Sequence, residues 1–220
     1  MIDFSIIITA LPALARGALV SLAIAAGASF IGLTFGALLG VCHQSKNKFL
    51  SIPVTCYITL MRGTPMLIQI PFFCYYIFPW LGLDFSLAVK ATLAIGLNSA
   101  AYISQIIRSG ITSISSGQIE AARMLGLKTW QTAWYILLPQ AIAVIAPALI
   151  SEFITLIKDS SLASTVSVVE LFKEGTIIIS KTYNAIPIYC AIAVIYLLLT
   201  ISLSWIGTHI QKKVRHYASH

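Results

Sequence analysis

The sequence predicts an all-α integral membrane protein, and three observations support that fold class. Of its 220 residues, 58% are hydrophobic and only 10% are charged, whereas an ordinary soluble domain carries about 25% charged residues. Several apolar stretches are long enough to cross a bilayer as helices. A single long polar insert, residues 113–139, stands between two of these stretches. A soluble protein could not keep so much apolar surface out of water, so we expect a membrane-embedded helical bundle.

Five segments are predicted to span the membrane, at residues 18–41, 53–80, 87–107, 141–157 and 186–209. Together they would make residues 1–220 a single transmembrane domain. Residues 1–15 are expected to form a short interfacial helix before the first span. Glycines four residues apart on one face of that span allow close approach of helix backbones, which favours packing within the chain over a dimer interface; they are Gly32, Gly36 and Gly40.

The second predicted span contains a break. Gly63 weakens a helix, and Pro65 removes a backbone hydrogen-bond donor. A broken backbone at membrane depth is tolerated only where protein or a water-filled cavity surrounds it. Arg62, beside the break, is costly in lipid. It therefore either faces a polar partner along a pathway or marks the edge of the membrane.

Two further spans carry polar side chains on one helical face. Asn98, Tyr102 and Gln105 lie at i, i+4 and i+7 in the third span and share one helical face, where they either join helices or line a path. In the fourth span Glu152, Thr155 and Asp159 share a face at i, i+3 and i+7. Carboxylates at this depth are costly unless they are paired or hydrated. Asp159 could end the helix at the interface, but that explanation is weaker for Glu152, which favours a pathway.

The distribution of charge predicts the orientation of the chain. Lys and Arg outnumber Asp and Glu by 14 to 7. If the loop 43–48, the stretch 108–139 and the C-terminal tail lie on one side, that side holds Glu120 as its single acidic residue. The positive-inside rule makes this side cytoplasmic. Five spans would then leave the N-terminus outside and the C-terminus in the cytoplasm, and the positive charge is a topology signal rather than a nucleic-acid-binding patch.

No enzyme site is predicted. The sequence has no Gly-x-Ser-x-Gly, Walker or dinucleotide-binding motif. Its cysteines and histidines lack the spacing of metal ligands. We therefore expect no catalytic residue, metal or cofactor, and any source of energy must lie on another chain.

The polar insert is predicted to form two short helices. Ser115 and Ser116 are favourable N-cap residues, and Gly126 suits the left-handed position that ends a helix. Thr129 can cap a second, amphipathic helix, and Pro139 is expected to break the chain before the fourth span. Such a pair of helices is either a lid on the bundle or a surface that contacts another protein.

Several motifs resemble those of ABC importer permeases of the polar amino acid branch, the histidine, glutamine and arginine permeases. The insert contains a Glu-Ala-Ala motif followed by glycine, Glu120-Ala121-Ala122-Arg123-Met124-Leu125-Gly126. Other matching segments, in the order of that family, are Arg62-Gly63-Thr64-Pro65, Asn98-Ser99-Ala100-Ala101-Tyr102 and Lys158-Asp159-Ser160-Ser161-Leu162. The resemblance extends over about residues 10–213.

The resemblance implies partners. In such permeases the Glu-Ala-Ala helix seats in a groove of a cytoplasmic ATPase, and ATP is bound and hydrolysed by that separate chain. The implied coupling residues here are Glu120, Ala121, Ala122, Arg123 and Gly126. Two ATPase subunits, a second permease protomer of the same or a sister chain, and a periplasmic or surface substrate-binding protein are also implied. The chain would lie in the bacterial inner (plasma) membrane among its lipids.

The resemblance also implies transport of a polar amino acid by alternating access. The carboxylates of the fourth span make a basic amino acid, such as arginine, the first expectation. Candidate pathway residues are Arg62, Asn98, Tyr102, Glu152, Thr155 and Asp159. Gln105 departs from the family pattern, which often has Glu there, so an ion pair with Arg108 would be reduced to a neutral hydrogen bond.

Two other function classes stay open at this point. A secondary transporter driven by an ion gradient could use Glu152 and Asp159 as ion sites, although no convincing internal repeat of the kind typical of that class is found. A membrane scaffold that transports nothing is the other alternative. Uptake that persists without an active ATPase would favour the first, and uptake indifferent to Glu152 would favour the second.

Overall fold

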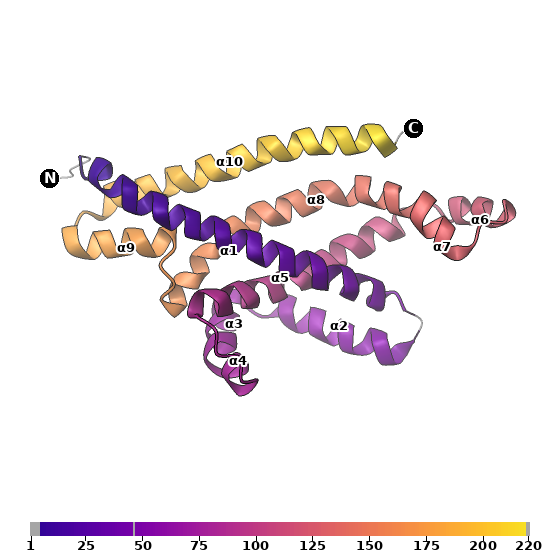
Figure 1. The fold of residues 1–220 in the computed structure, drawn as a ribbon, viewed down its shortest axis with the longest axis horizontal. Coiled ribbons are helices and arrows are strands. Elements are labelled where there is room, and N and C mark those ends of the chain that lie inside the picture. The colour runs from indigo at the N-terminus through magenta and orange to yellow at the C-terminus, as the bar shows by residue number, and fades with distance from the viewer. Residues whose placement is uncertain (1–4, 46, 219–220) are drawn as a thin grey trace.

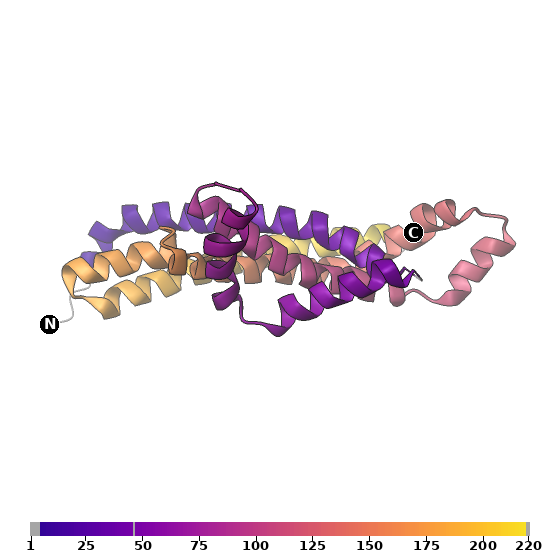
Figure 2. The same ribbon diagram turned by 90° about the horizontal axis from the view of Figure 1, so that it is seen from below.

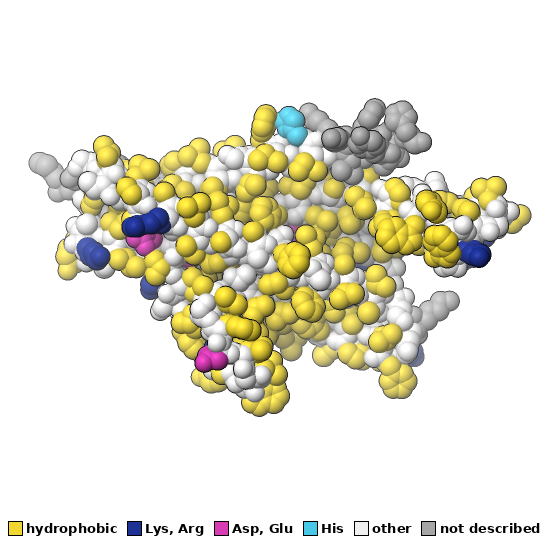
Figure 3. All heavy atoms as spheres, in the orientation of Figure 1, with side chains coloured by type: hydrophobic (Ala, Val, Ile, Leu, Met, Phe, Trp, Pro, Cys, Tyr) yellow, Lys and Arg dark blue, Asp and Glu magenta, His cyan; other side chains and the backbone are white. Residues whose placement is uncertain are grey.

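The computed structural model describes residues 5–45 and 47–218, with side chains described as far as residue 211. Within these ranges the secondary structure is helical, with no strand. The long helices lie roughly along one axis and form an elongated bundle (Figure 1). Hydrophobic side chains cover most of the length of the face shown in Figure 3, and most of its charged side chains lie toward the ends. This is the surface that a lipid-embedded all-α protein requires.

Four helices within the described residues are long and apolar enough to cross a membrane. They are Ile6–His43, Leu87–Thr112, Thr129–Val166 and Ala185–Gln211. Each contains most or all of one predicted span. The other predicted span, residues 53–80, does not form one helix, so the structure confirms a multi-span helical fold but not the count of five.

Helix α1 (Ile6–His43) is continuous, so the prediction of a separate interfacial helix at its start is wrong. One side of its first turns packs against protein, whereas Ile8 and Leu11 on the other side are exposed. Ala10 and Leu14 pack in a core cluster with Leu171 and Ile188 from later helices. Those later helices pack against one side of the start of α1, and this contact favours extending the helix toward the N-terminus.

The glycine face of α1 packs along α5 (Leu87–Thr112). A Cβ atom at Gly36 would lie 2.8 Å from Ile103 Cβ, and one at Gly32 would lie 2.9 Å from Ser99 Oγ. Both distances are shorter than a real side chain tolerates. The predicted close approach is therefore confirmed, and it is made within the chain.

The second predicted span is divided. It begins as α2 (Lys48–Gly63) and, after a break, continues as α3 (Met66–Phe72), the π-helical turn η1 (Phe73–Ile77) and α4 (Phe78–Trp80). Thr64 and Pro65 are extended, with ψ angles of 147° and 131°. The residue before a proline disfavours helical geometry, which places the break there. Figures 1 and 2 show the segment after the break running across the long axis of the bundle.

Two side-chain amides hold this break together. Gln69 Nε2 donates to the Met61 carbonyl at 2.9 Å and to Thr64 Oγ1 at 2.6 Å. Asn98 Nδ2, from α5, donates to the same Met61 carbonyl at 3.0 Å and to Gln69 Oε1 at 2.8 Å. The broken helix frees carbonyls that lipid could not satisfy. The amide group of Asn98 therefore joins helices, which was one of its two predicted roles.

The insert forms one short separate helix, and the second predicted helix is present but continuous with the fourth span. Helix α6 (Ser116–Met124) is capped by the Ser115 hydroxyl, which accepts from the Gly117 N–H at 3.3 Å. Gly126 has a φ of 75°, the left-handed conformation predicted for it. The chain then enters α7 (Thr129–Thr132), the π-helical turn η2 (Ala133–Leu137) and α8 (Leu138–Asp159) without interruption. The N-cap of α7 is Lys128 and not Thr129, as was predicted. The Lys128 N–H donates to Gln131 Oε1 at 2.8 Å.

The predicted break at Pro139 is wrong for a physical reason. A proline lacks the N–H of a normal helical turn, and its ring clashes with the carbonyl four residues earlier. The π-helical turn η2 ends two residues before Pro139 and widens the helix there, which removes the clash. The same arrangement recurs at Pro79, two residues after η1. A helix containing proline thus continues in both places.

The stretch after α8 is partly buried in the bundle. A 3₁₀ segment, η3 (Ser160–Val166), leads to α9 (Leu171–Thr182) and then to α10 (Ala185–Ala218). Ser160, Ala163 and Val166 are fully buried within η3. The helix α9 lies beside the first part of α1 (Figure 1).

The two ends of the bundle carry the segments that the charge pattern had grouped. The loop after α1, the helix α6 and the end of α10 lie at one end, and the start of α1 and α9 lie at the other (Figure 1). Some of the charges used for the orientation lie outside what the structure describes: Asp3, Lys46 and the side chains of Lys212, Lys213 and Arg215.

We expect Gly36→Leu to destabilise the protein, because its side chain would separate α1 from α5. Overpacking of a tight contact costs about 1–3 kcal/mol. The measurement is the thermal unfolding temperature of the purified protein in detergent. Ala37→Leu, at the neighbouring exposed position, is the control. Equal unfolding temperatures for the two variants would contradict this packing.

We expect Gln69→Leu to lower stability by about 1–3 kcal/mol, because buried acceptors at the break would lose their donor. The loss is measured by thermal unfolding in detergent. Gln118→Leu is the control, since Gln118 is an exposed amide that accepts from Gln140 at 3.0 Å. A loss of the same size in both variants would show that the amide at the break has no special role.

Candidate functional site

A polar cavity of about 300 Å³ lies between α5, α8, the start of η3 and the break that precedes α3. Its lining residues are Thr64, Met66, Asn98, Tyr102, Glu152, Thr155, Asp159 and Leu162. The structure therefore brings five of the six predicted pathway residues together. The sixth, Arg62, does not line the cavity but stacks on one of the lining residues.

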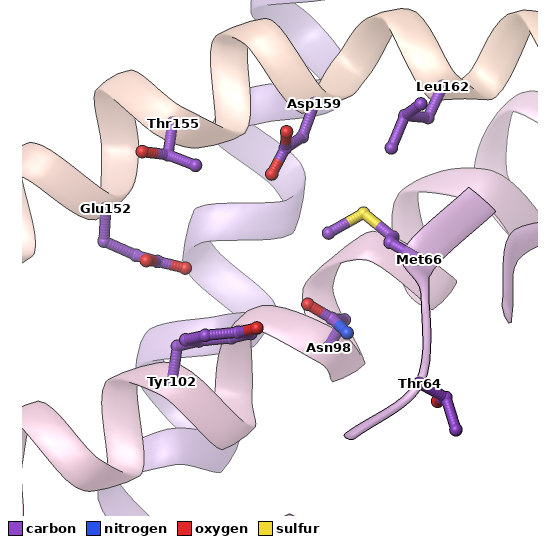
Figure 4. Close-up of a pocket in the computed structure, with 8 residues that line it drawn as sticks. All are labelled: Thr64, Met66, Asn98, Tyr102, Glu152, Thr155, Asp159 and Leu162. Atoms are coloured by element: carbon purple, nitrogen blue, oxygen red, sulfur yellow. The ribbon is translucent and has the colours of Figure 1, made fainter. Parts of the chain in front are cut away.

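The α8 wall of the cavity is acidic. Glu152, Thr155 and Asp159 project from one face of α8 toward α5 (Figure 4). Glu152 Oε1 accepts a hydrogen bond from Ser99 Oγ at 2.7 Å. Among the described residues, neither carboxylate has a Lys or Arg nitrogen within 4.0 Å. Two unpaired carboxylates at membrane depth make this cavity attractive to a cation.

The α5 wall provides an amide and a phenol. The side-chain nitrogen of Asn98 is occupied by the hydrogen bonds at the helix break. Tyr102 lies opposite Glu152 across the cavity (Figure 4). The guanidinium of Arg62 lies 5.2 Å from the centre of the Tyr102 ring, a cation–π contact. Arg62 thus has a partner within the protein, at the edge of the cavity.

Sequence reasoning missed several residues of this site. Ser99 follows Asn98 and projects about 100° away from it around the helix, so the face defined by Asn98 excluded it. Gln69 could have been found as a lone amide four residues after Pro65 in an apolar stretch. Met66 and Leu162 are apolar lining residues without a distinctive signal in the sequence.

A second polar contact joins α1 and α5 at the end of the bundle near α6. Gln105 Nε2 lies 3.2 Å from His43 Nδ1, and Arg108 lies 3.5 Å from His43 Nε2 through its terminal nitrogen. The expected neutral hydrogen bond between Gln105 and Arg108 is therefore replaced by contacts that His43 makes with both. His43 is 62 and 65 residues away from Gln105 and Arg108 along the chain, so no local sequence pattern predicted these contacts.

Helix α6 stands beyond the end of the bundle (Figures 1 and 2). Of the five residues proposed for ATPase contact, Glu120, Ala121, Arg123 and Gly126 are exposed, and Ala122 is buried. Met124 and Leu125, which follow them, are 89% and 79% exposed. Exposed apolar side chains that lie next to each other are one feature of protein contact surfaces. The position of α6 fits a contact surface better than a lid over the bundle.

Comparison with known proteins gives the family. Residues 32–216 match the family described as "Binding-protein-dependent transport system inner membrane component". The chain is 37% identical over 210 residues to the "Probable amino-acid ABC transporter permease protein YckA" of Bacillus subtilis (strain 168), covering 96% of this chain and 92% of that one. It is 34% identical over 215 residues to the "Glutamine transport system permease protein GlnP" of Escherichia coli (strain K12), covering 97% and 98%.

Further comparisons agree with this match. The "Arginine transport system permease protein ArtQ" of Bacillus subtilis (strain 168) is 32% identical over 214 residues, covering 97% of this chain and 98% of that one. The solved structure titled "Crystal structure of an amino acid ABC transporter with histidines" superposes with a TM-score of 0.89 at 31% identity, covering 97% and 99%. The chain belongs to the family of binding-protein-dependent transport system inner membrane components, and it is a permease subunit of an amino-acid ABC importer.

Proposed function

We propose that this permease carries a basic amino acid, such as arginine, across the bacterial inner membrane. The observation that supports this choice is the pair of carboxylates, Glu152 and Asp159, that line one cavity without a cationic partner among the described residues. Relatives are named for glutamine and for arginine. A neutral amino acid brings one ammonium group, whereas a basic one brings a second cation for the second carboxylate.

The cavity also suits an amino acid in size and in its remaining polarity. Its volume of about 300 Å³ is at the small end of the range for small-molecule pockets. Arg62, held against Tyr102 at the edge, is the candidate partner for the substrate carboxylate. Arginine side chains bind carboxylates in a planar, two-point geometry. Thr155 adds a hydroxyl beside the two carboxylates.

The exposed surface of α6 is the proposed site of energy coupling. Ala121 has a side chain small enough for close docking, and Glu120 and Arg123 give the same surface charges of both signs. Gly126, in its left-handed conformation, turns the chain so that α6 projects from the bundle. A cytoplasmic ATPase dimer that seats α6 in a groove would supply ATP binding and hydrolysis from outside this chain.

Transport then follows the alternating-access scheme. Closure of the ATPases on ATP would move α6 and turn the cavity toward the outside, where a substrate-binding protein delivers the amino acid. A second permease protomer, identical or a sister chain, would complete the complex. The chain itself performs no chemical step.

The proposed topology has five crossings. Helices α2, α3 and α4 together would make the second crossing, although the break divides it. The figures support this count, because α1 and α10 run in the same direction and the start of α1 lies at the end opposite α6. The N-terminus would then be outside, and the C-terminus and α6 would be in the cytoplasm.

A cysteine at Ala121 is expected to crosslink to the co-expressed ATPase, because this exposed position lies on the proposed docking surface. The experiment uses a version without the four native cysteines, a short bifunctional thiol reagent and gel analysis. Tyr183→Cys, 91% exposed at the other end of the bundle, is the control and should not crosslink. Absence of a crosslink from position 121 in an assembled complex would argue against ATPase docking at α6.

Glu152→Gln is expected to weaken uptake of arginine or lysine more than uptake of glutamine. Loss of one charge-assisted contact raises the KM of a cationic substrate by about 10-fold. Uptake kinetics with a panel of amino acids measure the difference. Glu174→Gln, on α9 and outside the cavity lining, is the control. Equal losses of uptake for basic and neutral amino acids would remove the argument that the substrate is a basic amino acid.

A further inference from the structure

A buried hydroxyl, that of Ser99 on α5, contacts one of the two carboxylates of the cavity. Ser99 Oγ donates to Glu152 Oε1 at 2.7 Å, the length of a strong hydrogen bond to a charged group. Ser99 is 1% exposed and does not itself line the cavity. Among the described residues, Glu152 has no second hydrogen-bond donor. One carboxylate oxygen is therefore held by the protein, and the other is left for a ligand.

The hydrogen bond of Ser99 is unusual for a serine within a helix. Such a hydroxyl ordinarily donates to a backbone carbonyl one turn earlier in its own helix. Two other serines of α5 do so, Ser104 to the Ala101 carbonyl at 2.7 Å and Ser109 to the Ile106 carbonyl at 2.8 Å. Among the described residues, Ser99 makes no such bond and donates across to α8. Satisfying a buried hydroxyl alone does not require a partner on another helix.

The side chain of Glu152 lies between two cavities. Besides the polar cavity, it lines a second cavity of about 300 Å³ between α1, α5, α8 and α10. Glu152 and Ser29 are the polar side chains among the residues that line this second cavity. A glutamate side chain has several rotamers, and a charged carboxylate is costly in apolar surroundings. The hydrogen bond from Ser99 restricts the carboxylate to rotamers in which Oε1 meets α5.

Helix α1 fixes the place of Ser99 in turn. A Cβ atom at Gly32 would lie 2.9 Å from Ser99 Oγ and 3.1 Å from Ser99 Cβ. The glycine therefore leaves the space that the serine side chain occupies, and the contact limits the movement of that side chain. Three helices meet at this point: α1 packs on Ser99, which lies on α5, and Ser99 holds Glu152 of α8.

We propose that Ser99 is a positioning residue for the substrate. It holds Oε1 of Glu152 at the boundary between the two cavities, so that the second oxygen is placed to bind a cationic group of the substrate in the polar cavity. Gly32 keeps Ser99 in place. The inference deepens the proposed function and rests on it, because it assigns Ser99 an effect on the affinity for a basic amino acid. Ser99 itself makes no contact with the substrate.

The first test compares two buried serines of α5. We expect Ser99→Ala to raise the KM for arginine or lysine uptake by the complete transporter about five-fold, because a charged acceptor loses its donor. The maximal rate should change little, and the KM for glutamine should rise less. Ser104→Ala is the matched control, since Ser104 is fully buried and its hydroxyl bonds within its own helix. It should leave every KM unchanged.

A double variant tests whether Ser99 acts through Glu152. In the background of Glu152→Gln, Ser99→Ala should raise the KM for basic amino acids no further, because no charge is left to position. If the two losses of affinity multiplied, Ser99 would act by another route and the proposal would be wrong.

Two glycines of α1 test the support from behind. Gly32→Ala should raise the KM for basic amino acids as Ser99→Ala does, because its methyl group would displace the Ser99 hydroxyl. Gly40→Ala is the control. A Cβ atom there would lie 3.2 Å from the Ser104 carbonyl oxygen and from Ile107 Cγ2, so it tightens the same pair of helices away from Ser99. Equal effects of the two variants would assign the role to helix packing and contradict the support of Ser99 by Gly32.

A last measurement reports on Glu152 without any substrate. An apolar carbodiimide reacts with carboxyl groups inside the membrane, and mass spectrometry of the modified peptides gives the labelling rate of each residue. We expect Ser99→Ala to raise the labelling rate of Glu152 several-fold, because the oxygen that Ser99 held is released. Glu170, which has four hydrogen-bond donors, is the internal reference and should be labelled at an unchanged rate. Ser104→Ala should change neither rate.

The two proposals fail in different ways. An unchanged labelling rate of Glu152 in Ser99→Ala would overturn the positioning role, and so would equal rises of the KM in Ser99→Ala and Ser104→Ala. Faster labelling of Glu152 in a transporter that carries no basic amino acid would support the positioning of the carboxylate and contradict the proposed substrate.

Discussion

The structure depends on one constraint: a polar group inside a lipid-embedded bundle must find its partner within the protein. Among the described residues, no buried side-chain nitrogen or oxygen atom lacks a hydrogen-bond partner. The constraint is strictest where the backbone is irregular, at the break before α3 and at the turn between η3 and α9. In both places a side chain from a distant part of the chain supplies what the backbone lacks, Asn98 in the first and Ser21 in the second.

The candidate cavity is where this constraint is only partly met. Glu152 has one hydrogen bond, from Ser99, whereas Glu170 has four donors. The two glutamates show that the surroundings of a carboxylate decide whether it has a structural or a functional role. A carboxylate surrounded by donors holds helices together, and one that faces an open space can exchange partners with a substrate.

The sequence predicted much of the fold and of the cavity for identifiable reasons. Helical periodicity placed Glu152, Thr155 and Asp159 on one face, and glycine spacing predicted the close contact of α1. The prediction failed at Pro139, because a π-helical turn accommodates the proline in a way that local propensity does not reveal. It also missed Gln69, Ser99 and Glu170, because their partners come from helices whose neighbours cannot be known before the chain folds.

The sequence by itself determined that this chain is a helical membrane protein and that it carries a Glu-Ala-Ala insert, since composition and motifs are local properties. The tertiary structure alone decided which polar residues face one another. The Ser21–Glu170 contact joins residues 149 positions apart, and the cavity joins the helix break to α8. Such pairings depend on how the helices pack. Lipid surrounds every apolar face of a membrane helix equally well, so only packing and polar contacts between helices determine which faces meet.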